Sequence, residues 1–194
     1  MPLLFVLSGP SGVGKDSLLA RMKARGLHLH FAVTAATRPP RPGEKDGQDY
    51  HFLSLERFME MREKGELLEW AQVYGHWYGV PKAEIRSALS RGEDVMMKVD
   101  VQGADTIKGL LPQAISIFLV PPSPEELQRR LASRQTEGGA SLELRLRTAQ
   151  EEMKHLPLFD YGVINDDLGR AARRVEAIIT AENCRVNPRR VEIS

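Results

Sequence analysis

The chain has 194 residues and a formal net charge of +1, with 27 lysines and arginines against 26 aspartates and glutamates. This length suits one α/β domain with a buried core, and the even charge gives no reason to expect nucleic acid or an anionic membrane as a partner. The single cysteine, Cys184, excludes an internal disulfide framework and a cysteine-based zinc site.

The first apolar run, at residues 3–7, has the length of a strand. Such a run without polar alternation is typical of a strand that is buried on both faces of a parallel sheet. It is too short for a signal peptide or a membrane span, no basic segment precedes it, and no later run reaches membrane length. We therefore expect a soluble, cytoplasmic protein.

Three later segments repeat this strand pattern, and helical patterns lie between them. Strands are predicted at residues 95–99, 114–120 and, more weakly, 161–164. Helices are predicted at residues 16–25, 82–91, 124–134 and 168–181. Strands that alternate with helices predict an α/β fold with a doubly wound parallel sheet.

Two stretches interrupt this alternation. Residues 35–50 are dense in proline, glycine and charge, so we expect them to lie outside the core. They open a segment, roughly 32–83, that has short strand-like pieces near 50–52 and 67–74. The second stretch, residues 134–152, is rich in charge. We interpret both as inserts on the surface of the sheet, and inserts of this size are often lids.

The seven residues near the end of the first strand fit the pattern G-x-x-x-x-G-K. They are Gly9, Pro10, Ser11, Gly12, Val13, Gly14 and Lys15. Glycines let the backbone fold tightly around an anion, successive N–H groups point at it, and the next helix adds its positive N-terminal end. A glycine-rich turn without function is the alternative, but a strand before the motif and a helix after it favour a phosphate-binding loop. We expect Lys15 to reach the β- and γ-phosphates of a nucleotide.

Asp16 departs from the usual form of this motif, in which a serine or threonine follows the lysine and binds Mg²⁺. A carboxylate also suits Mg²⁺, although it adds negative charge close to the phosphates. An aspartate is equally suited to the first turn of a helix, where the dipole favours it. Asp16 and the next residue, Ser17, are therefore both candidates for contact with Mg²⁺.

Two arginines, Arg38 and Arg41, lie among prolines that stiffen their loop. Two guanidinium groups held near one point make a bidentate phosphate site. A solvated basic loop is the alternative, and these two residues alone do not decide between them.

From this loop onward the sequence resembles the guanylate kinases. The matching segments are residues 37–44 (TRPPRPGE), 46–52 (DGQDYHF), 65–71 (GELLEWA), 78–82 (YGVPK), 100–104 (DVQGA), 145–146 (RL) and 163–167 (VINDD). They lie in the family's order and, with the phosphate loop, extend over about residues 3–180. The resemblance implies a P-loop kinase core at residues 1–31, 84–124 and 156–194, a GMP-binding insert at 32–83 and a helical lid at 125–155.

The family's activity would be transfer of the γ-phosphate of ATP to GMP with Mg²⁺. By the resemblance, the GMP-binding residues are Thr34, Arg38, Arg41, Tyr50, Glu69 and Tyr78. Glu69 would read the base, because guanine offers two adjacent donors, N1–H and the N2 amino group, to one carboxylate, whereas adenine presents an acceptor at N1. Val80 stands where a serine or threonine usually helps to bind guanine, so selectivity would rest more heavily on Glu69.

The resemblance also implies the residues on the donor side. The catalytic set would be Lys15, Arg38, Arg134 and Arg145, in which Arg134 and Arg145 are lid arginines that also match a charged helix face. ATP would contact the phosphate loop, Asp16, Ser17, Arg134 and, at the adenine, Asn165. Asp100 would help to organise Mg²⁺ and its waters. Lys98 stands where many relatives carry an acid, and we assign it no role.

Two other functions fit parts of the sequence. The run at residues 14–19 (GKDSLL) also resembles the ribose 1,5-bisphosphate phosphokinases, although a sugar phosphate has no guanine edge for Glu69 to read. Guanylate kinase-like modules of scaffold proteins bind peptides, but they typically lack a working phosphate loop. The sequence leaves the oligomeric state open.

Overall fold

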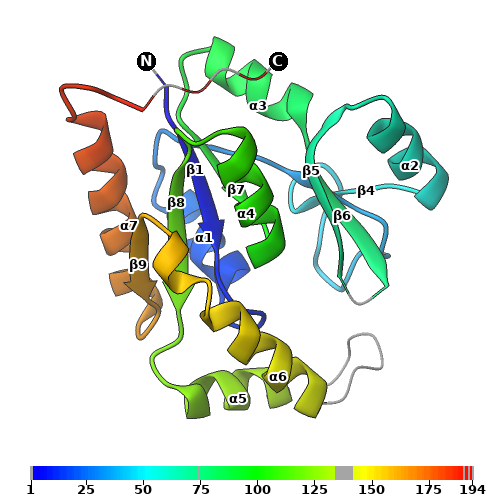
Figure 1. Ribbon diagram of the computed structural model, residues 1–194, viewed down its shortest axis with the longest axis vertical. Helices are drawn as coiled ribbons and strands as arrows, with labels where there is room; N and C mark the ends of the chain where they lie inside the picture. The colour runs from blue at the N-terminus through cyan, green and yellow to red at the C-terminus, as the bar shows by residue number, and fades with distance from the viewer. Residues whose placement is uncertain (1, 74, 134–141, 190, 192, 194) are drawn as a thin grey trace.

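The computed structural model describes residues 2–73, 75–133, 142–189, 191 and 193. Its centre is a five-stranded sheet in the order β2–β7–β1–β8–β9, in which every neighbouring pair is parallel (Figure 1). The strands are β1 (Leu4–Ser8), β2 (His30–Phe31), β7 (Val95–Lys98), β8 (Ile115–Val120) and β9 (Tyr161–Ile164). The predicted α/β class with a parallel sheet is confirmed.

Helices cover both faces of this sheet because successive side chains of β1 point in opposite directions. Phe5 and Leu7 are fully buried against α1 (Lys15–Ala24) and α7 (Leu168–Asn183). Leu4 and Val6 are buried against α3 (Lys82–Ser90) and α4 (Val101–Leu110). A strand with helices on both sides needs apolar residues at every position, which explains the unbroken run in the sequence.

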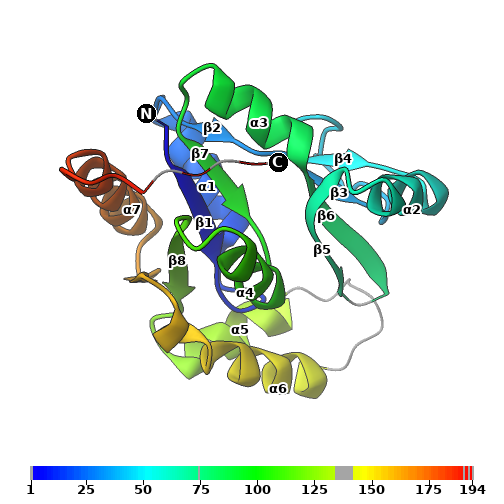
Figure 2. The same ribbon diagram turned by 45° about the horizontal axis from the view of Figure 1, so that its top comes forward.

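A second sheet stands beside the first, in the order β4–β3–β6–β5 (Figure 2). Its strands are β3 (Thr34–Ala36), β4 (Tyr50–Phe52), β5 (Leu67–Val73) and β6 (His76–Pro81). The helix α2 (Leu55–Glu63) packs its buried Phe58 against Leu67 of this sheet. Ala35 and Ala36 of β3 and Tyr50 of β4 are buried, so the expectation that residues 35–50 lie outside the core is wrong at these three positions. Neither α2 nor α4 was among the expected helices.

Two helices lie at the end of the central sheet to which its strands point (Figures 1 and 2). They are α5 (Pro124–Ser133) and α6 (Leu142–Met153), and a short 3₁₀ helix, Leu156–Leu158, follows them. Leu127 and Leu131 of α5 pack against Ala149 of α6. In the part of the chain that the structure describes, no helix has the length and apolar character needed to cross a membrane.

Replacement of Leu7 by alanine should lower the free energy of unfolding by about 2–5 kcal/mol, because it leaves a cavity between β1 and the helices on that face. Urea unfolding of the variant and the wild type measures this. Leu158→Ala is the control, since Leu158 is 62% exposed and its truncation should change stability by no more than about 0.5 kcal/mol. Equal effects of the two changes would contradict the assignment of Leu7 to the core.

Candidate active site

The carboxyl ends of three central strands meet at one edge of the sheet. The phosphate loop follows β1, Lys98 and Asp100 lie at the end of β7, and Asn165 follows β9. A cavity of about 410 Å³ lies between this edge and the second sheet. The predicted site residues that line it are Ser11, Gly12, Val13, Gly14, Lys15, Asp16, Thr34, Arg41, Tyr50, Glu69, Tyr78 and Asp100.

The phosphate loop depends on its glycines, as Gly9 and Gly14 show. Gly9 has φ of 140°, and a Cβ there would lie 2.4 Å from the carbonyl oxygen of Leu119 in β8. Gly14 has φ of 102°, and a Cβ there would lie 2.7 Å from the side-chain nitrogen of Asn165. Both conformations are rare for other residues, so the loop can pack this closely only with glycine.

Lys15, the first residue of α1, turns back onto the loop. Its ammonium donates to the carbonyl oxygens of Gly9 at 2.5 Å and Pro10 at 3.2 Å. Burial lowers the pKa of Lys15, although the carboxylates of Glu152 and Asp16 act in the opposite direction. The loop carbonyls therefore hold the ammonium group beside the place where we expect phosphate oxygens to bind.

Glu152, near the end of α6, also contacts the loop. Its Oε2 accepts a hydrogen bond of 3.0 Å from the backbone N–H of Ser11, one of the groups that face an anion in such loops. Burial raises the pKa of Glu152. In the free protein, the carboxyl group of Glu152 therefore occupies a backbone N–H that we expect to bind an anionic ligand. This contact could not be predicted from the sequence, because 141 positions separate the two residues.

Asn165 and Arg130 fix the back of the phosphate loop. The buried amide of Asn165 donates to the carbonyl oxygen of Val13 at 2.7 Å. Arg130 of α5 donates to the same oxygen at 3.1 Å and to the backbone oxygen of Asn165 at 3.2 Å. The expected adenine contact of Asn165 stays a prediction, and its amide also holds the loop in shape.

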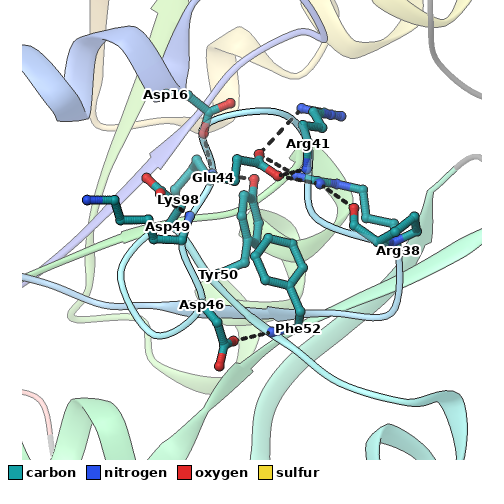
Figure 3. Close-up of polar contacts among 11 residues, drawn as sticks. Asp16, Arg38, Arg41, Glu44, Asp46, Asp49, Tyr50, Phe52 and Lys98 are labelled. Carbon is teal, nitrogen blue, oxygen red and sulfur yellow. Dashed lines mark hydrogen bonds and ion pairs between the residues drawn. The ribbon is translucent and has the colours of Figure 1, made fainter.

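On the opposite side of the cavity, the loop that carries Arg38 and Arg41 (the arginine loop) lies beside Tyr50 of the second sheet (Figure 3). Arg38 is 7% exposed and forms a bidentate pair with Glu44, at 2.6 and 2.7 Å. Its guanidinium also lies 4.8 Å from the ring centre of Tyr50. Arg41 lines the cavity, whereas Arg38 is not among the lining residues. In the free protein, Glu44 therefore holds the guanidinium of Arg38 over the ring of Tyr50 and out of the cavity lining.

Glu69 of β5 is 4% exposed and lies at the N-terminal end of α4. Burial, with a smaller contribution from Asp100, raises its pKa to about 8. A Cβ on Gly103 would lie 2.6 Å from the carboxyl carbon of Glu69, so glycine at this position makes room for the carboxyl group. Val80, on the neighbouring strand, is buried in the core beside Leu68 and does not line the cavity.

The carboxylates near the loop are too few for a metal site built by the protein alone. Within the described ranges, no three histidine, cysteine, aspartate or glutamate side chains are grouped to hold a metal ion. Asp16 is half exposed, and Asp100 uses one oxygen to cap α4 through the N–H of Gly103 at 2.7 Å. Such a set fits Mg²⁺, which typically binds one or two carboxylates, several waters and the phosphates of a substrate.

The two predicted lid arginines differ in what the structure describes. Arg134 lies outside the described residues. Arg145 lies on α6, seven residues before Glu152, and this spacing places both on one face of the helix. Since Glu152 contacts the phosphate loop, Arg145 is on the side of α6 that faces the site.

Comparison with known proteins agrees with this arrangement. The family model described as guanylate kinase matches residues 2–182. A guanylate kinase of Clostridioides difficile is 44% identical over 95% of this chain and 90% of its own length. The chain belongs to the guanylate kinase family. Guanylate kinase 2 of Oryza sativa, chloroplastic/mitochondrial, is 47% identical over 99% of this chain and 68% of its own.

The crystal structure of guanylate kinase from Anaplasma phagocytophilum superposes with a TM-score of 0.80 at 32% identity. The match covers 95% of this chain and 88% of that one. The resemblance that the sequence segments indicated is therefore confirmed, and so is the fold of the guanylate kinases.

Replacement of Glu69 by glutamine should stabilise the free protein increasingly as the pH rises from about 4.5 to about 8. The folded wild type binds the Glu69 proton more tightly than the unfolded chain, with a pKa of about 8 against 4.5. Its contribution to stability is therefore fully present below about pH 4.5 and is lost as the pH rises through about 8. Glutamine cannot ionise, so the variant does not lose stability in this way as the pH rises.

Urea unfolding at a series of pH values compares the two proteins. Glu66→Gln is the matched control, because Glu66 lies in the same segment and its side chain is 41% exposed. Parallel stability profiles for wild type and Glu69→Gln would show that the Glu69 pKa is not raised in the folded protein.

Proposed function

We propose that this protein transfers the γ-phosphoryl group of ATP to GMP, giving ADP and GDP. The observation that carries the proposal is one cavity with a phosphate loop on one side and a buried carboxyl group, Glu69, on the other. Membership of the guanylate kinase family supports the same reaction. Residues 32–83 would bind GMP, residues 125–155 would act as the lid, and the enzyme would work in the cytoplasm.

On the donor side, ATP replaces contacts that the protein makes with itself. The N–H of Ser11 exchanges the carboxyl group of Glu152 for a phosphate oxygen, and Lys15 turns from the loop carbonyls to the β- and γ-phosphates. The N-terminal end of α1 adds its positive dipole. Arg134 and Arg145 would approach the phosphates from the lid, and Asn165 would contact the adenine.

Mg²⁺ would reach the site with ATP, held by the phosphates together with Asp16 or Ser17 and, through water, Asp100. Bound there, it would neutralise charge on the β- and γ-phosphates. Phosphoryl transfer needs positioning and charge neutralisation more than covalent help, so the cations of the chain contribute in the same way.

On the acceptor side, Arg41, Tyr50 and Tyr78 would bind the phosphate of GMP. Arg38 would join them when the phosphate competes with Glu44 for its guanidinium. Thr34 would contribute its hydroxyl beside the base. These side chains would place the acceptor phosphate between the second sheet and the phosphate loop.

Glu69 would accept hydrogen bonds from guanine N1–H and from the N2 amino group once it is ionised. Because its pKa in the free protein is about 8, most of the protein carries a neutral Glu69 at pH 7. Binding of guanine would therefore release a proton. Adenine would not offset the free energy of ionising Glu69, because its N1 is an acceptor that would face the carboxylate.

A coupled assay of ADP release tests the function with GMP, AMP, UMP, CMP and ribose 1,5-bisphosphate as acceptors. We expect efficient turnover with GMP alone. Turnover with ribose 1,5-bisphosphate but not with GMP would instead assign the chain to a sugar-phosphate kinase. Absence of ATP turnover with every acceptor would favour a binding module.

Glu69→Gln should lower kcat/KM for GMP about a hundredfold, on the scale of a lost charge-assisted hydrogen bond of about 1.5–3 kcal/mol. Glutamine keeps the size of the side chain but turns one acceptor into a donor that opposes the guanine donors. The ratio of kcat/KM for GMP to that for AMP should fall as well, because a site built around hydrogen bonds loses its discrimination with them.

Steady-state kinetics of Glu69→Gln and of the control Glu66→Gln measure both effects. An unchanged preference for GMP over AMP in the Glu69 variant would refute the role of this residue in reading the base.

A further inference from the structure

Two charged side chains at the carboxyl end of the central sheet lie in contact with each other. Lys98 forms an ion pair with Asp16. In the sequence 82 positions separate them. The carboxylate beside the phosphate loop and the ammonium at the end of β7 therefore belong to one arrangement.

Lys98 also contacts the second sheet. Its ammonium donates to the hydroxyl of Tyr50 at 2.5 Å and lies 4.3 Å from the centre of that ring. Figure 3 shows the ammonium between Asp16, which follows the phosphate loop, and Tyr50, which lies beside the arginine loop. The side chain thus joins the two halves of the cavity.

The side chain of Lys98 is only 13% exposed, and it lines the cavity. The carboxylate of Asp16 is its counter-ion. Lys15 is close enough for the two ammonium groups to repel each other. Lys15 and Lys98 are therefore two partly buried cations that line the same cavity.

We propose that Lys98 is a phosphate-binding residue for the acceptor, and that it contacts the phosphate of GMP together with Tyr50. The proposal rests on the proposed function only for the identity of the nucleotide. Asp16 acts as the counter-ion of Lys98 while the site is free. When both substrates are bound, Lys98 neutralises charge on the acceptor side as Lys15 does on the donor side.

The geometry explains why a cation at this position is useful. The acceptor phosphate must approach the γ-phosphate closely, and like charges that are poorly solvated repel strongly. The hydroxyl of Tyr50 can donate only one hydrogen bond, whereas the ammonium beside it has three donors. One of these meets Asp16 and another meets Tyr50, and Lys98 lines the cavity, so the third donor can serve a phosphate oxygen there.

Calorimetry with GMP and with guanosine, in the absence of ATP and Mg²⁺, tests this role. We expect Lys98→Met to weaken GMP about tenfold to a hundredfold, the range of one charge-assisted hydrogen bond, and to leave guanosine unchanged. Lys98→Arg keeps the charge and should retain most of the affinity for GMP. Asp16 is 51% exposed, so water can solvate its carboxylate when the lysine is removed.

Lys108→Met is the matched control, because Lys108 is also ion-paired, with Asp160 at 3.0 Å, but does not line the cavity. It should leave the affinity for GMP unchanged. Lys98→Gln, which keeps a polar end group for Tyr50, gives the same comparison if the Lys98→Met chain does not fold.

Three outcomes would overturn the proposal. They are unchanged GMP affinity in both neutral variants, an equal loss for GMP and guanosine, and a loss in Lys98→Arg as large as that in Lys98→Met. The proposed function is tested separately by the wild type. If it binds GMP but transfers no phosphate to it, the kinase activity fails while the phosphate contact of Lys98 stands.

Discussion

Parallel pairing of β1 with β7 and β8 is the constraint on which the site depends. In a parallel sheet the strands end at the same edge, so the phosphate loop, Lys98 and Asp100 are brought together although they come from distant parts of the chain. Helices on both faces hold this edge in place through the unbroken apolar runs of the strands. Loops at the carboxyl ends of parallel strands are a general location for nucleotide sites, because helix N-termini begin there.

The second sheet adds the groups that a phosphate loop cannot supply. It carries Glu69 on β5 and Tyr50 on β4, and the arginine loop runs between β3 and β4. A buried carboxyl group destabilises the free protein when it ionises, so under the proposed function Glu69 would represent stability given up for selectivity. Gly103 leaves room for Glu69, since any larger side chain there would meet the carboxyl group.

The sequence predicted the features that are encoded locally. The strands 95–99 and 161–164 and the phosphate loop follow from short patterns, and Glu69 followed from family segments joined to the chemistry of guanine. The helix α4 was missed because two glycines weaken its pattern, whereas the structure holds it with the Asp100 cap and with buried Ala104 and Ile107. The contacts of Glu152 and Lys98 could not be predicted, because each depends on which distant segments the sheet brings together. The pair of Glu44 with Arg38 depends instead on how their own loop folds. The insert and lid boundaries and the roles of the individual site residues stay predictions.

The contact between Glu152 and Ser11 has a consequence for the anions among which such an enzyme works. A carboxyl group tethered by the fold competes at an effective concentration on the order of millimolar. Inorganic phosphate offers only a few contacts and must displace that internal competitor, as it must displace Glu44 from Arg38 on the acceptor side. A nucleotide that displaces the same carboxyl groups makes further contacts through its base, its sugar and several phosphate oxygens. The free site would in this way be shielded from inorganic phosphate and remain open to nucleotides, which make more contacts.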